Sequence, residues 1–201
     1  MAGSVSATPP RDGGNPVLRG IGWLSTLAGW TSAAMIVSAV AITCQMIFVR
    51  FVLNGSTVWQ TEAVIYLMIA ATLVGLPYVQ QLRGHVNVDL IPLALKGGAR
   101  RAMFLLTSLL SIGIVAIMLW YGFEFWHFAW ERGWKSDTVW GVRLWIPYLS
   151  IPVGFALLLL QLIADLVAVA LRYDTPFGLP DDAGLGAPVL PDGVIADGKD
   201  A

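Results

Sequence analysis

The polar residues that could do chemistry in this sequence lie in two groups, on either side of one apolar run. Arg50, Trp59 and Glu62 precede the run, and Arg83-Gly84-His85 and Asp89 follow it. An arginine and a glutamate at these positions suit either an ion pair that fixes a turn or two solvated charges, the second arrangement contributing about 0–1 kcal/mol. Both interpretations of Arg50 and Glu62 stay open at this point.

The alternation of His85, Asn87 and Asp89 raises the question of a metal site. Three ligands of mixed kind, without a fourth, are weak evidence for a metal ion. Local turn and cap contacts, or contacts to another subunit, suit His85 and Asp89 better. Cys44 is the one cysteine, which excludes an internal disulfide, and its place in an apolar run predicts a small buried residue. We therefore expect no metal site and no cofactor.

The two histidines also bear on haem binding, the chemistry of some small membrane anchors. A haem with two histidine ligands needs both imidazoles near one iron atom. His85 and His127 are predicted on opposite sides of a bilayer about 30 Å thick, so they cannot share one haem. The sequence shows no nucleophile–base pair, no glycine-rich phosphate loop and no cluster of acids, which argues against an enzyme.

The elements that must position these residues are membrane helices. The chain has 201 residues, of which 57% are hydrophobic and 12% charged, whereas soluble domains carry about 25% charged residues. Four apolar runs are long enough to cross a bilayer, which takes about 20 residues each. The sequence therefore predicts an all-α integral membrane protein whose four transmembrane helices lie at about residues 24–48, 62–82, 102–123 and 147–171.

The four spans are expected to form one domain, residues 21–172, between disordered tails at 1–20 and 173–201. The third helix should extend toward residue 134, because Trp126, Trp130 and Trp134 recur at every fourth position, which is one helical face. This repeat predicts a Trp-rich segment at the membrane interface.

Two residues within the spans call for a physical account. Pro77 is expected to kink or loosen the second helix near its end. Asp165 lies close to the end of the fourth helix, where its carboxylate can reach water. Pairs of small residues four apart, Ala34 with Ser38 and Ala71 with Gly75, favour close contact between helices.

The distribution of lysine and arginine predicts the orientation of the chain. Eight of the twelve lie in the two tails and the loop between the second and third helices, and the other four are Arg50, Arg132, Lys135 and Arg143. The positive-inside rule then puts both termini in the cytoplasm and the Trp-rich segment on the periplasmic side. A net charge of −1 gives no basic face for nucleic acid.

Taken together, the polar groups resemble a known family. An arginine that ends the first helix, Trp-x-x-Glu at the start of the second, a late glycine, and Arg-Gly-His followed by Val-Asp are similar to the small, DctQ-like membrane subunit of tripartite ATP-independent periplasmic (TRAP) transporters. The resemblance covers about residues 20–172. Thr61 departs from the family pattern, which often has a second acid beside the glutamate. The residues that carry the resemblance are Arg50, Trp59, Glu62, Gly75, Arg83, His85 and Asp89.

The resemblance implies a supporting role rather than a transport site. Such subunits sit in the bacterial inner membrane with a large permease subunit, while a periplasmic binding protein delivers the substrate. The resemblance implies a scaffold for sodium-coupled uptake of small organic acids such as dicarboxylates, and the residues that carry it become candidates for structural or subunit contacts. A haem or quinone anchor of an oxidoreductase and a free-standing small membrane protein are the alternatives.

Overall fold

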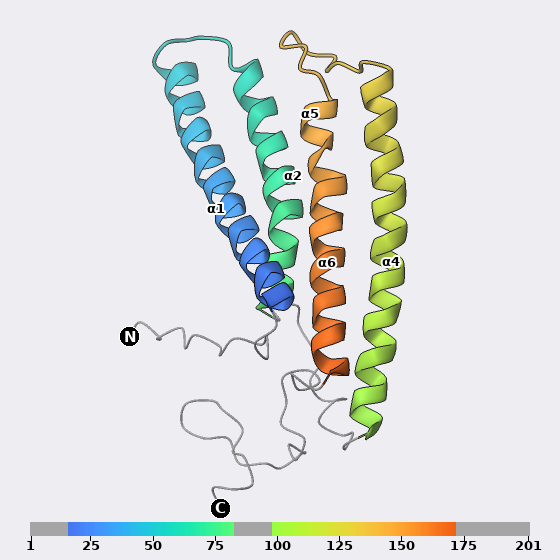
Figure 1. The fold of residues 1–201 in the computed structure, drawn as a ribbon. Helices are drawn as coiled ribbons and strands as arrows, with labels where there is room; N and C mark the ends of the chain where they lie inside the picture. The colour runs from blue at the N-terminus through green and yellow to red at the C-terminus, as the bar shows by residue number, and fades with distance from the viewer. Residues whose placement is uncertain (1–15, 83–97, 172–201) are drawn as a thin grey trace, which may run out of the picture.

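The computed structural model describes residues 16–82 and 98–171, which form α-helices joined by short connections (Figure 1). Four helical segments are long and apolar enough to cross a membrane, the last of them made of α5 and α6 together. The prediction of an all-α chain with four such segments is confirmed. In chain order the helices are α1 (Pro16–Phe51), α2 (Val58–Gln81), α4 (Gly98–Glu131), α5 (Trp145–Tyr148) and α6 (Ser150–Ala170).

The long helices lie side by side in the order α1, α2, α6, α4 (Figure 1). Helix α2 packs extensively on α1 and α6, and α4 packs mainly on α6. The connections 52–57 and 132–144 lie at the same end of the helices (Figure 1). The helices therefore form an open row and not a closed bundle around a common axis.

Small residues allow α1 and α2 to approach closely. A Cβ atom added at Gly75 would lie 2.8 Å from Ser32 Oγ, and that hydroxyl donates a 2.7 Å hydrogen bond to the carbonyl of Ala71. The predicted pair Ala71 and Gly75 thus lies at the contact with α1, as small residues do in membrane helix packing. Ala34 and Ser38, the other pair, are exposed.

The contact between α2 and α6 brings two backbones together. A Cβ atom at Gly154 would lie 2.7 Å from the carbonyl oxygen of Leu73. This carbonyl has no helical N–H partner, because the residue four positions later is Pro77, which lacks that hydrogen. Pro77 is buried, and α2 continues beyond it to Gln81. The proline therefore frees a carbonyl at the point where α6 comes closest.

A proline and a serine account for the short break between α5 and α6 at Leu149. Pro152 cannot donate to the carbonyl of Tyr148, and Ser150 Oγ donates to the carbonyl of Pro147 at 2.7 Å. A hydroxyl that bonds an upstream carbonyl in this way often accompanies a local bend.

The third span ends before Trp134, which differs from the sequence expectation. Gly133 has φ +60°, and the amides of Gly133 and Trp134 donate to the carbonyls of Trp130 and Ala129. This pair of bonds is the Schellman arrangement that stops helices at a glycine. Trp134 instead turns back and packs its ring edge-on against Phe125 and Phe128.

Replacing Gly154 with alanine should destabilise the fold by about 1–3 kcal/mol, because the new methyl group meets backbone atoms that cannot move aside. The matched control is Gly113→Ala in α4, where an added Cβ meets no atom within 4 Å. Thermal unfolding of both variants in detergent measures the difference. Equal midpoints for the two variants would contradict the close α2–α6 contact.

Candidate functional site

The second helix begins beside a hairpin that belongs to the connection 132–144. Within this hairpin, Lys135 and Arg143 form an antiparallel bridge, and the amide of Ser136 donates to the carbonyl of Val142 at 2.8 Å. Gly141, with φ +60°, closes the turn through a 3.0 Å hydrogen bond to Thr138. The hairpin is a compact local unit that presents hydroxyl groups to α2.

Glu62 connects the hairpin to α2. Ser136 Oγ donates a 2.7 Å hydrogen bond to Glu62 Oε1, and Ser136 Oγ also lies 3.2 Å from the hydroxyl of Thr138. Glu62 is only 9% exposed. Its second carboxylate oxygen, Oε2, is buried and has no hydrogen-bond partner. The glutamate therefore holds the hairpin with one oxygen and leaves the other unsatisfied.

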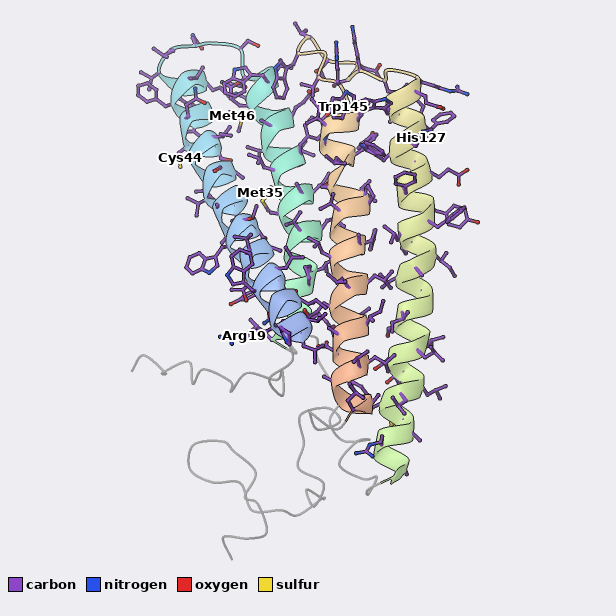
Figure 2. All side chains as sticks on the ribbon, viewed as in Figure 1. Arg19, Met35, Cys44, Met46, His127 and Trp145 are labelled. Carbon is purple, nitrogen blue, oxygen red and sulfur yellow. The ribbon has the colours of Figure 1, made fainter. Side chains whose placement is uncertain are left out.

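Trp59 adds an aromatic contact to this junction. Its ring lies 6.2 Å from that of Trp140 in the hairpin, at 58° between the planes. Two residues after Trp59, Thr61 Oγ1 lies 3.5 Å from Met46 Sδ of α1, which points between the two helices (Figure 2). Trp59 and Glu62 thus both contact the hairpin, which lies far from them in sequence.

Arg50 does not pair with Glu62 in the structure. The arginine is exposed at the end of α1, and no ion pair joins it to Glu62 within 4 Å. Of the two arrangements that the sequence left open, the structure shows an exposed Arg50 without an ion pair to Glu62. Glu62 is not the second solvated charge, because it is buried against Ser136.

The aromatic residues after the middle of α4 fix the fourth span to the third. Trp126 Nε1 donates a 3.1 Å hydrogen bond to the carbonyl of Trp145, and the rings of Trp130 and Trp145 are 4.4 Å apart. Trp126 and Trp130 also contact each other, with ring centroids 5.8 Å apart. The Trp-rich segment therefore acts as a clamp between α4 and α5.

A second polar cluster joins α1, α2 and α6 near the end of the helices that lies away from the hairpin. Ser25 Oγ donates to Gln161 Oε1 at 2.7 Å, and Gln161 Nε2 donates to Asp165 Oδ1 at 2.9 Å. Gln80 Nε2 donates to Asp165 Oδ2 at 3.1 Å. The carboxylate of Asp165 thus accepts hydrogen bonds from two helices, beyond the contact with water that its position predicts.

Within the described ranges, the residues considered for metal, haem or thiol chemistry do not come together in a binding site. His127 is exposed and lies 3.8 Å from Glu131, and no group of three or more histidines, cysteines and acids comes together in residues 16–82 and 98–171. Cys44 is exposed on the side of α1 away from α2 (Figure 2). The expectation that Cys44 is buried is therefore wrong for this chain.

With this geometry in view, comparison with known families becomes informative. The family described as tripartite ATP-independent periplasmic transporters, DctQ component, matches residues 39–172. The chain belongs to the DctQ family. No curated protein and no solved structure matched the chain. DctQ proteins are the small permease subunits of TRAP transporters, so the chain is a component of a transporter and works with the other TRAP components.

The DctQ match contains the junction between Glu62 and the hairpin and the whole of α2, α4 and α6. It begins at residue 39, so the part of α1 that carries Ser25 and Ser32 lies outside it. Of the DctQ-like motif residues, Trp59 and Glu62 come together at the hairpin. Gly75 lies at the α1 contact. Arg83, His85 and Asp89 lie outside the described residues.

Sequence reasoning missed the polar residues that contact these positions. Ser136 hydrogen bonds to Glu62 across a sequence separation of 74 residues, which no local pattern in a DctQ sequence reveals. The cluster around Asp165 had a local signal, because Gln161 lies four residues earlier on the same helical face. Glutamine and aspartate inside an apolar span call for a partner on a neighbouring helix.

Replacing Ser136 with alanine should loosen the hairpin, because Glu62 loses its hydrogen bond while the backbone of the hairpin is unchanged. A net loss of about 1 kcal/mol corresponds to amide exchange roughly fivefold faster at Ser136 and Leu144. Hydrogen exchange with mass spectrometry measures it, with Ser38→Ala as the control, since Ser38 bonds only its own helix. Unchanged exchange would show that Glu62 does not hold the hairpin.

Replacing Gln161 with leucine should weaken the contact among α1, α2 and α6. Coupling between Ser25 and Gln161, measured in a double-mutant cycle, should be about 0.6 kcal/mol, the average for polar pairs in membrane helices, and at most about 1.7 kcal/mol. The control is Gln45→Leu, at an exposed glutamine of α1. Reversible unfolding in mixed micelles gives the energies, and a coupling near zero would contradict the cluster.

Proposed function

We propose that this chain is a membrane scaffold, which holds the large permease subunit during sodium-coupled, binding-protein-dependent uptake of small organic acids such as dicarboxylates. Membership of the DctQ family supports the place of the chain in a TRAP transporter. The observation that carries the scaffold role is the open row of helices, which offers wide apolar surfaces.

The polar side chains in the middle of the spans support a role without a translocation path. Thr31, Ser38, Thr43 and Thr72 each donate to the carbonyl four residues earlier in their own helix. A carrier instead needs polar groups that converge near the middle of the membrane to replace the hydration of its substrate. These hydroxyls already have partners within their helices, so we assign the substrate and sodium sites to the large subunit.

Helix α4 supports the presence of a partner or of lipid along one side of the row. Its most apolar stretch of 18 residues has no buried residue within the chain. A stationary element that braces a moving subunit needs such a surface, together with firm attachment of its own helices. Both requirements are met when α4 packs on α6 and is fixed to α5 through its tryptophans, while its outer face stays available.

We propose the bacterial inner membrane as the location and the periplasm as the side of the hairpin. The support is the bias of lysine and arginine toward the two tails and the loop between the second and third helices, which are predicted on the other side of the membrane. Val139, at the tip of the hairpin, is 96% exposed, which makes it a suitable reporter. In a Cys44→Ser background, Val139→Cys should react with a membrane-impermeant maleimide from the periplasmic side.

The control for this orientation is Gly20→Cys, at the other end of α1, where the backbone leaves open space. It should react only after the inner membrane is permeabilised. Labelling of the two cysteines with the sides exchanged would refute the proposed orientation, and equal labelling of both without permeabilisation would refute it as well.

Proteoliposomes test the scaffold role directly. Vesicles with this chain alone should show no uptake of a labelled dicarboxylate. Vesicles with this chain, the large subunit and the binding protein should accumulate it under an inward sodium gradient and not under a potassium gradient. Uptake of the dicarboxylate by vesicles that contain this chain alone would contradict the proposal. Full uptake by the large subunit and binding protein without this chain would remove the scaffold role.

A further inference from the structure

A groove runs along α2 beside the hairpin. Its volume is about 530 Å³, and one end of it is formed by Thr138 of the hairpin. The remaining wall comes from two turns of α2. The residues that line it are Val58, Thr61, Glu62, Ile65, Tyr66 and Thr138.

The carboxylate of Glu62 interrupts a mostly apolar wall. Val58 and Ile65 give the apolar surface on either side of it along α2, and both are partly exposed. Glu62 lies about 6 Å along the helix from Val58. Tyr66 adds a hydroxyl group that can donate a hydrogen bond, whereas the hydroxyl of Thr138 already has a partner in the hairpin. A ligand that fits must therefore bring a polar group to Glu62 and an apolar part along Ile65.

The carboxylate of Glu62 sets the charge of that polar end. One of its oxygens accepts from Ser136, while Oε2 is buried without a partner, in a side chain that is only 9% exposed. A buried charge without a partner costs several kcal/mol. A donor with positive charge removes that cost, and the side chain of Glu62 lines the groove.

We propose that this groove binds a phospholipid with a primary ammonium headgroup. The ammonium group would donate a charge-assisted hydrogen bond to Glu62 Oε2. The phosphate would accept from the hydroxyl of Tyr66, and one acyl chain would lie along Ile65.

The observations favour a lipid over the basic side chain of a protein. Apolar residues extend the groove along the membrane-spanning part of α2, beyond the carboxylate, and a lysine or arginine would leave that stretch uncovered. They also favour a primary ammonium over a trimethylated one, because an acceptor oxygen without a partner is satisfied by an N–H and not by a methyl group. The groove has a single carboxylate, which is too few oxygen ligands for a divalent cation.

The test uses the full chain, purified with its large subunit in mild detergent and stripped of lipid. Native mass spectrometry then measures binding of phosphatidylethanolamine, phosphatidylcholine and phosphatidylglycerol with identical acyl chains. We expect phosphatidylethanolamine to bind at least tenfold more tightly than the other two. Equal binding of the three lipids, or a preference for phosphatidylglycerol, would overturn the proposal.

Variants locate the site. Glu62→Gln should lower phosphatidylethanolamine binding about tenfold, to the level of phosphatidylcholine, whereas Glu131→Gln, at an exposed acid of α4, should leave it unchanged. Ile65→Trp should weaken binding of the acyl chain without touching the carboxylate. Ser136→Ala keeps the carboxylate and should keep the preference for the ammonium headgroup. Binding by Glu62→Gln equal to that of the unaltered chain would overturn the site.

A chemical test needs no variant and so does not depend on how a substitution folds. In unaltered complexes in phosphatidylethanolamine bilayers, a carbodiimide should activate the Glu62 carboxylate and form an amide with the lipid amine. Mass spectrometry of the peptide should show a lipid adduct at Glu62. An amide with a lysine of the large subunit, or no adduct at Glu62 while exposed acids react, would overturn the proposal.

Discussion

The packing of α2 between two neighbours is the interaction on which the rest of this structure depends. On one side, Ser32 bonds to the backbone of α2 across a gap that Gly75 keeps open. On the other side, Gly154 lets α6 approach the carbonyl of Leu73, which Pro77 leaves without a helical partner. In a bilayer the apolar surfaces of helices gain little from contact with each other. Close backbone approach and hydrogen bonds must therefore hold them together.

Polar contacts then fix both ends of α2. The Asp165 cluster joins α1, α2 and α6 at one end, and the hydrogen bond between Glu62 and Ser136 joins α2 to the hairpin at the other. Polar groups that are buried between membrane helices have few water molecules to bond, so each needs a partner within the protein. The same argument applies to Glu62 Oε2, whose missing partner sets it apart from the satisfied oxygens of Asp165.

The number and type of the spans could be predicted from the sequence, because about 20 apolar residues admit only a helix in a bilayer. Trp134 could not be placed, because its repeat with Trp126 and Trp130 suits a helix, while Gly133 adopts a left-handed conformation and ends it. The partner of Glu62 could not be predicted either, because Ser136 approaches it only through tertiary structure. Small residues four apart predict a helix contact without knowledge of the partner; Gly75 lies at such a contact, whereas Ala34 and Ser38 are exposed.

The open row also explains why a chain of this kind would work beside another protein. Helix α4 is attached to one neighbour, through Trp126, Trp130 and the close contact at Gly122, and its opposite side meets no other described helix closely. A closed bundle would bury more of its apolar surface within the chain and leave less of it for contact with a partner. In this chain the contacts that hold the helices lie within one row, so a second subunit can cover α4 without displacing any of them. Attachment of the chain to itself and attachment to a partner thus use different surfaces, which is the requirement for a part that stays in place while its partner moves.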